Sequence, residues 1–187
     1  MLIDFDTVII FFVGMYAIAK LAGFVTRRSI FDASLRIELA RLLLGLYIMA
    51  LLGITLFPIE LPPVKMDVGL AEHVNFQILS FLREGWSLSI VKQVLGNVLI
   101  FVPAYPLAIL AGMPEKRWYE ALFCVAACSM FLETMQLVEN VTGLSGFFGR
   151  VTDVNDLFLN TLGGMIGFAV IWMYKRYIIE KREQHED

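Results

Sequence analysis

The stretch WYEALFCVAACSMFLETMQLV, residues 118–138, decides how the chain folds. It is apolar for about 20 positions, which at about 1.5 Å per helical residue matches the hydrocarbon core of a membrane, about 30 Å thick. Glu133 and Gln136 nevertheless interrupt it near its end. The stretch therefore predicts a membrane-spanning helix that carries a carboxylate at membrane depth.

Apolar stretches of similar length lie at about 5–24, 39–58, 91–112 and 156–174. With 58% apolar and 18% charged residues among 187, and a mean hydropathy of +0.72, the chain is more apolar than a soluble domain of this size. We therefore expect an all-α integral membrane protein, a single transmembrane domain over residues 1–187 with about five spans. The connection at about 59–90 is expected to form short interfacial helices in an outer loop.

Basic residues are distributed unevenly between the two ends of these spans. Eleven of the 15 Lys and Arg residues fall on one side, and Lys65, Arg83, Lys92 and Arg150 fall on the other. Because Lys and Arg near the ends of spans favour the cytoplasm, the N-terminus is expected outside and the C-terminus inside the cell.

Polar side chains within the spans gather on the outer side. Gln93 and Asn97 share a face of the third span, at i and i+4, and Glu133 lies within about two helical turns, roughly 8 Å, of the outer boundary. The predicted set of ligand-binding residues is Asn97, Glu133, Gln136, Arg150, Asp153, Asp156 and Asn160. On the last span, Gly163, Gly164 and Gly167 follow Asp156 and Asn160 toward the inner side of the membrane. These small residues predict close helix packing.

A carboxylate in hydrocarbon costs about 2.5 kcal/mol or more, so Glu133 should face the bundle interior and have a partner, for which Arg150 is the candidate. Two plainer interpretations stay open. Asp153 is also typical of a helix N-cap, with Asp156 in the first turn near the positive end of the helix dipole. An ion pair between Glu133 and Arg150 would equally serve as a structural clasp between two helices.

Four motifs bring a family resemblance: GNVLIFVP at 96–103, SMFLETMQ at 129–136, GR at 149–150 and DVNDLFLNTLGGMIGF at 153–168. Together they resemble the VanZ-like family of bacterial membrane proteins, over about residues 45–170. The matching positions are Asn97, Ser129, Glu133, Gln136, Arg150, Asp153, Asp156, Asn160, Thr161, Gly163, Gly164 and Gly167. The chain departs from the family where Asn155 replaces a frequent second acid, and in the segment VNFQIL at 74–79.

The resemblance implies a multi-pass protein of the bacterial plasma membrane. Some family members are associated with resistance to teicoplanin and other lipoglycopeptide antibiotics, which act outside the cell on lipid-linked peptidoglycan precursors. The polar set predicted above lies on the corresponding side of the membrane.

The first functional hypothesis is a site for the head group of a lipid-linked cell-envelope precursor or a polyprenyl phosphate, gripped by Arg150 and the amides. Because carboxylates repel an anionic head group, this hypothesis calls for a divalent cation, Ca²⁺ or Mg²⁺, with Glu133, Asp153 and Asp156 as candidate metal ligands.

Two other functions compete with binding. An integral membrane hydrolase or transferase acting on a lipid-linked substrate would use Glu133 as general acid or base. Against it, the sequence shows no recognised nucleophile motif, so whether the protein is an enzyme stays open. The third hypothesis is a scaffold or partner-docking protein, in which the glycine-rich face of the last span supports assembly into an oligomer. Nothing in the sequence indicates nucleic-acid binding.

Overall fold

A computed structural model shows a bundle of long helices and describes residues 2–3, 6, 9–10, 12–14, 16, 35–64, 73–83, 87–145 and 152–186. The predicted span at about 5–24 lies mostly outside the described residues. Within them, four helical stretches are long and apolar enough to cross a membrane: Leu35–Leu56, Leu88–Leu110, Trp118–Thr142 and Val154–Ile179. The all-α membrane class is thus confirmed.

The elements follow in the order β1 (Leu2–Ile3), α2 (Leu35–Leu56), β2 (Ile59–Glu60), β3 (Val74–Asn75), α3 (Ser80–Arg83), α4 (Leu88–Phe101), α5 (Ala104–Leu110), α6 (Trp118–Thr142), β4 (Thr152–Asp153) and α7 (Val154–Glu186). The strands are two residues long. β1 pairs with β2 in antiparallel orientation and β3 pairs with β4 in parallel orientation. The predicted outer loop therefore contains the short helix α3 and the strands β2 and β3, whose partners β1 and β4 lie outside it.

Local sequence signals explain where the helices begin and end. The Ser87 side chain caps α4 by accepting a hydrogen bond of 3.3 Å from the Ile90 N–H. Pro103, which has no N–H to donate, stands in the turn that separates α4 from α5, so the third span is broken there. Gly143 ends α6 with φ of 77°, a left-handed conformation that glycine adopts without steric cost.

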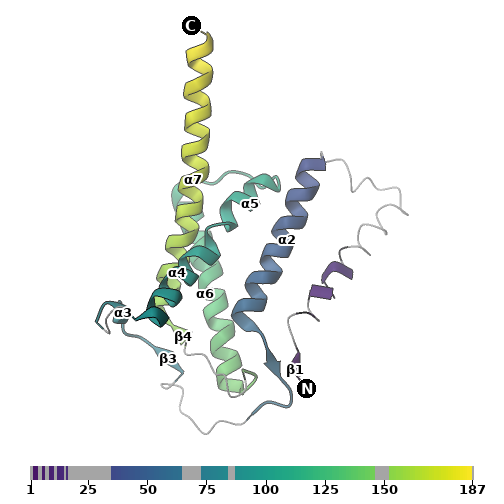
Figure 1. Cartoon of the computed structure of the whole chain (residues 1–187), viewed down its shortest axis with the longest axis vertical. Helices are drawn as coiled ribbons and strands as arrows, with labels where there is room; N and C mark the ends of the chain where they lie inside the picture. The colour runs from purple at the N-terminus through teal and green to yellow at the C-terminus, as the bar shows by residue number, and fades with distance from the viewer. Residues whose placement is uncertain are drawn as a thin grey trace.

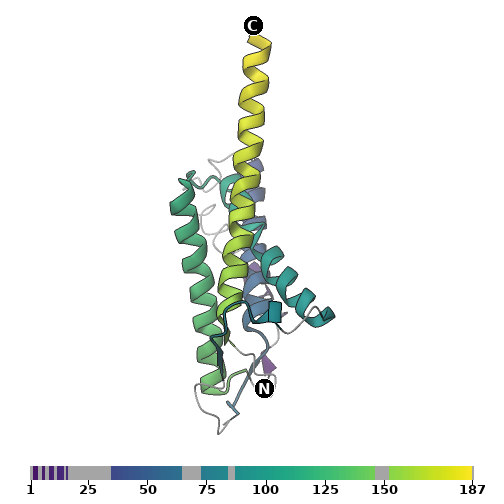
Figure 2. The ribbon, with the colours of Figure 1, turned by 90° about the vertical axis from the view of Figure 1, so that its left-hand side faces the viewer.

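Helix α7 is the centre of the bundle, since it packs against α4, α5 and α6, whereas α2 packs against α5 and α6. In Figure 1, α7 runs upward past every other element, and Figure 2 shows α4 set apart from α6 on the other side of α7. We call the end where α4 and α7 begin the polar end. The opposite end, where α6 begins and which carries Lys116, Arg117, Lys175 and Arg176, is the basic end.

The bundle has a small interior and an apolar exterior. Phe101, Val125 and Leu132 are buried together, and Ile100 packs against them. Large apolar side chains such as Phe123, which is 74% exposed, face outward along the spans. Because such a surface is stable only in contact with lipid, the exterior agrees with a membrane-embedded bundle.

Candidate functional site

Polar side chains from four helices meet at the polar end of the bundle. A groove of about 380 Å³ lies among them. Its polar lining consists of Thr55 from α2, Lys92, Gln93 and Asn97 from α4, Gln136 from α6 and Asp156 from α7. Ile54, Gly96 and Ile100 complete the lining, so one groove presents both polar and apolar surface.

The α4 wall of the groove faces the start of α7. Gln93 Nε2 donates a hydrogen bond of 3.3 Å to Asp156 Oδ1. Asn97 lies one turn further along α4 and also lines the groove, as the i and i+4 spacing predicts. Its Nδ2 is buried beside the Asp156 carboxylate, without a hydrogen bond of normal geometry among the described residues. The groove thus presents an amide donor next to an acid.

Gln136 joins the α6 wall of the groove to α2. Its Nε2 donates a hydrogen bond of 3.0 Å to the backbone oxygen of Thr55. This contact uses the amide nitrogen of Gln136 to position α2. The bond does not use the amide oxygen of Gln136, which can accept a hydrogen bond from an occupant of the groove.

Glu133 is buried, 8% exposed, and lies one turn before Gln136 on α6, deeper in the bundle. Its carboxylate accepts a hydrogen bond from the backbone N–H of Asp153, at the entry to α7. The second carboxylate oxygen, Oε2, is buried without a hydrogen-bond partner in the described part of the chain. Glu133 therefore combines a structural contact with an oxygen whose partner is not among those residues.

Asn160, 5% exposed, connects α7 to α6 deeper in the bundle. Its Nδ2 donates a hydrogen bond of 3.1 Å to Ser129 Oγ, a hydroxyl that is fully buried. Its Oδ1 is buried and unpartnered as far as the structure describes the chain. Because buried polar atoms are nearly always hydrogen-bonded, those of Glu133 and Asn160 call for partners that the described residues do not supply.

Asp153 is held at the mouth of this site by a network from the outer loop. Asn75 Nδ2 donates to Asp153 Oδ2 at 2.9 Å, across the β3–β4 pair. Asp153 Oδ1 accepts from the backbone N–H of Asn155 at 2.8 Å, the contact of an N-cap. Three donors thus satisfy Asp153, since the Asn155 side chain also donates to Oδ1 at 2.7 Å. The N-cap interpretation of Asp153 agrees with this geometry.

Asn155, 3% exposed, is a residue that motif reasoning did not select. Its Oδ1 accepts from the Leu79 N–H at 2.6 Å, and its Nδ2 donates to the Gln77 oxygen at 2.9 Å. An acid at this position would lack the N–H that this geometry uses. The asparagine at position 155, where the family often has an acid, therefore suits the backbone groups of the loop segment 77–79 that it contacts.

The glycines of α7 allow it to approach both neighbours. A Cβ at Gly163 would lie 2.0 Å from the Val98 oxygen of α4, and one at Gly167 would lie 2.3 Å from the Val102 oxygen. At Gly164 it would lie 2.4 Å from the Val125 side chain of α6. Contacts this short exclude any side chain, so the spacing between helices depends on glycine here.

Arg150 lies outside the described residues, so its predicted ion pair with Glu133, Asp153 or Asp156 stays a prediction. Residues 35–64, 73–83, 87–145 and 152–186 contain no group of three His, Cys, Asp or Glu side chains placed to hold a metal ion. The divalent cation also stays a prediction, for which Glu133, Asp153 and Asp156 do not supply a ready-made set of ligands.

Comparison with known proteins agrees with the motifs that form this site. No curated protein and no solved structure matches the chain. Residues 44–175 match the family described as VanZ/LLP1, a range that contains the groove, the buried amides and the three glycines. Since this range is more than half of the sequence, the chain belongs to the VanZ/LLP1 family.

Proposed function

We propose that the groove at the polar end binds the head group of a lipid-linked cell-envelope precursor or a polyprenyl phosphate. The observation that carries this proposal is a groove lined by Asn97, Gln136 and Asp156 at one end of a membrane bundle, with the buried polar atoms Glu133 Oε2 and Asn160 Oδ1 deeper in the same helices. An occupant with several polar oxygens and hydroxyls would satisfy such atoms.

The groove has the mixed chemistry that a lipid ligand needs. Ile54 of α2 and Ile100 of α4 supply apolar surface beside the polar wall. Lys92, an exposed cation of the same lining, is placed to attract a phosphate. In this arrangement the head group occupies the polar wall, and the hydrocarbon tail leaves between α2 and α4 into the leaflet.

The acids of the site require a cation when the ligand is anionic. Asp156 lines the groove directly, and Asp153 and Glu133 lie behind it at the start of α7. In the proposal, a divalent cation bridges Asp156 and the lipid phosphate, with Arg150 as an additional positive partner expected from the sequence.

We further propose that this binding underlies a role in the cell envelope, including resistance to lipoglycopeptide antibiotics such as teicoplanin. These compounds act on lipid-linked precursors at the outer surface of the membrane. A protein that holds the precursor head group at that surface would limit their access to it. The proposal requires the polar end to face outward, as the distribution of basic residues predicts.

The test fills the groove without disturbing the packing of the bundle. An added Cβ at Gly96 meets no atom within 4 Å, so a larger side chain there extends into the groove that Gly96 lines. Native mass spectrometry of the protein in nanodiscs, with polyprenyl phosphate and Mg²⁺, should show binding to wild type and G96A and at least about tenfold weaker binding to G96L. Equal binding of polyprenol, or undiminished binding to G96L, would refute the proposal.

A second candidate function is a hydrolase or transferase in which Glu133 acts as general acid or base. The observation in its favour is a buried carboxylate near the groove whose Oε2 has no partner in the part of the chain that the structure describes. Incubation with a polyprenyl pyrophosphate should then release phosphate in wild type and not in E133Q. Absence of turnover under conditions where the lipid binds would leave binding as the function.

A further inference from the structure

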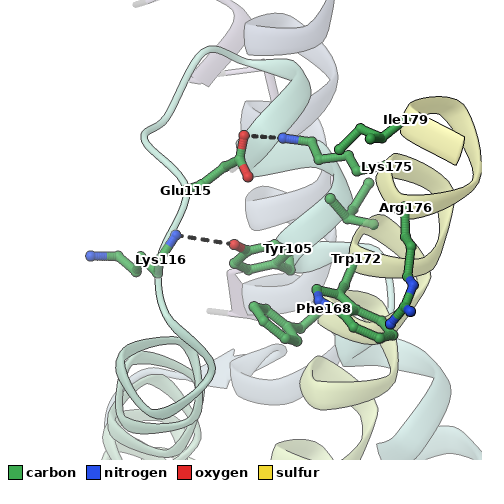
Figure 3. A pocket seen from close by; sticks show the side chains of 9 residues that line it. Tyr105, Glu115, Lys116, Phe168, Trp172, Lys175, Arg176 and Ile179 are labelled. Atoms are coloured by element: carbon green, nitrogen blue, oxygen red, sulfur yellow. Dashed lines mark hydrogen bonds and ion pairs between the residues drawn. The ribbon is translucent and has the colours of Figure 1, made fainter. Parts of the chain in front are cut away.

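A second cavity lies at the basic end of the bundle, at the opposite end of α7 from the polar groove. It has a volume of about 490 Å³ and lies between α5, the loop before α6 and the C-terminal half of α7. Figure 3 shows Tyr105, Phe168 and Trp172 forming its aromatic side. Lys175 of α7 stands above these rings, and the Arg176 side chain runs down beside Trp172. The cavity therefore combines an aromatic surface with two adjacent cations.

The cavity lies at the depth of lipid phosphates. Measured from Val154, about 30 Å of hydrocarbon covers about 20 residues of α7, so Lys175 and Arg176 emerge just beyond its boundary. The first residue of α6, Trp118, is 62% exposed at the same end, as expected for an aromatic side chain in the head-group region. The cations are thus level with the phosphates of the adjacent leaflet.

The contacts of the two cations differ. Arg176 Cζ lies 5.5 Å from the centroid of the Trp172 ring, which orients the guanidinium along the aromatic wall. Lys175 Nζ forms an ion pair with Glu115 across the cavity, shown as a dashed line in Figure 3. The Lys175 and Glu115 side chains are 38% and 62% exposed, so water screens this pair and a competing anion can replace the carboxylate.

The aromatic wall is fixed by contacts of its own. Tyr105 and Phe168 pack edge to face with ring centroids 5.1 Å apart. The Tyr105 hydroxyl accepts a hydrogen bond of 3.2 Å from the Lys116 backbone N–H. The Tyr105 O–H is not used in this bond, so it can donate a hydrogen bond to an anion in the cavity. A pre-formed wall with a hydroxyl and two cations is suited to a phosphate carried by an apolar tail.

We propose that this cavity binds an acidic phospholipid of the adjacent leaflet. The lipid phosphate lies between Lys175 and Arg176, displacing Glu115 from Lys175, and the acyl chain follows Phe168 and Trp172 along α7. The site selects lipids of net negative charge, because Lys175 and Arg176 repel the quaternary ammonium of a zwitterionic lipid, which offsets their attraction for its phosphate. It is separate from the polar groove and does not depend on the function proposed for it.

Native mass spectrometry of the full-length protein, with phosphatidylglycerol and phosphatidylcholine of identical acyl chains, tests the proposal. Wild type should retain phosphatidylglycerol preferentially, and K175Q/R176Q should bind it at least about tenfold more weakly, since each basic residue near an anionic surface contributes about fivefold. K181Q, which removes a charge from an exposed position further along α7, should bind like wild type. E115Q should bind more tightly, because Lys175 no longer has a competing carboxylate.

Equal retention of the two lipids by wild type, or phosphatidylglycerol binding to K175Q/R176Q equal to that of wild type, would overturn the proposal. Glycerol phosphate added in excess should not displace the lipid, because the acyl chain supplies part of the affinity; displacement would mean that the cavity is a site for soluble phosphate. A D156N variant should keep phosphatidylglycerol binding unchanged, which separates this cavity from the polar groove.

Discussion

Asn75 Nδ2 donates a hydrogen bond of 2.9 Å to Asp153 Oδ2, although 78 residues separate the two in the sequence. The bond lies across the parallel pairing of β3 with β4, in which Thr152 N–H also donates to the His73 oxygen at 2.9 Å. The segment at 73–75 is thereby fastened to the start of α7. The outer loop thus takes part in the candidate site and does not simply connect two spans.

Asn155 should be a major determinant of stability at this junction. The change N155D removes the side-chain N–H that donates to Gln77 and Asp153, and it places a second carboxylate beside Asp153. Since each unsatisfied buried polar group costs about 1–3 kcal/mol, the thermal midpoint in detergent should fall by several degrees. Q77A, which changes an exposed side chain of the same segment, is the control and should unfold like wild type. An unchanged midpoint for N155D would mean that the loop is not held through this amide.

A disulfide should form between the paired strands. Val74 and Thr152 are register partners in the β3–β4 pair, and neighbouring strands lie about 4.8 Å apart, within the range that a disulfide spans. In a C124A/C128A background, V74C/T152C should close on mild oxidation and lose reactivity with a maleimide. V74C/L162C, whose second position is an exposed site more than two turns along α7, should stay reactive. Reactive thiols in both proteins would contradict the pairing.

The glycines of α7 should differ in their tolerance of alanine. At Gly163 the new Cβ would collide with the Val98 oxygen, so G163A should lower the thermal midpoint and the yield of folded protein. G96A is the matched control, because nothing lies within 4 Å of its new Cβ and alanine favours a helix by up to about 1 kcal/mol. Equal stability of the two variants would mean that α4 and α7 are too far apart for this contact.

Glu133 separates the functional hypotheses from a structural role. E133Q keeps an oxygen that accepts the Asp153 N–H, so the variant should stay folded and inserted in the membrane. Under the proposed function it should nevertheless lose activity, read as lipoglycopeptide susceptibility in cells. E133L removes the acceptor and should lose thermal stability as well. If E133Q is as active and as stable as wild type, Glu133 has no part in binding or catalysis.

Orientation in the membrane should follow the distribution of basic residues. In the same cysteine-free background, S87C at the polar end should react with an impermeant maleimide on intact cells, and E115C at the basic end should react only after permeabilisation. The reverse pattern would place the groove in the inner leaflet, where it could not bind precursors that are exposed at the outer surface.

Four of the apolar helices, and the polar residues that share one end of them, were predictable because their signals are local. Helix periodicity places Gln93 and Asn97 on one face, and the groove contains both, together with Gln136 and Asp156. The break at Pro103 follows from the chemistry of a single residue. The match to the VanZ/LLP1 family likewise confirms a resemblance carried by short motifs.

The contacts of Asn75 and Asn155 were not predictable in the same way. Two-residue strands have no periodicity, and their pairing partners are set by how the chain folds over a long distance. Leu79 illustrates the difficulty: its φ of 56° is unusual for a bulky residue, and its N–H donates to Asn155. Only the assembled bundle shows the three hydrogen bonds that Asn75 and Asn155 form between the segment at 74–79 and the start of α7.

Helix α7 joins the two ends of the molecule as one rigid rod. Asp156 in its first turn lines the polar groove, and Arg176, about 30 Å further along the same helix, lines the cavity at the basic end. No proline interrupts the helix between them. The polar groove and the cavity at the basic end are therefore built on one continuous helix, and a rigid tilt of α7 would move Asp156 and Arg176 together.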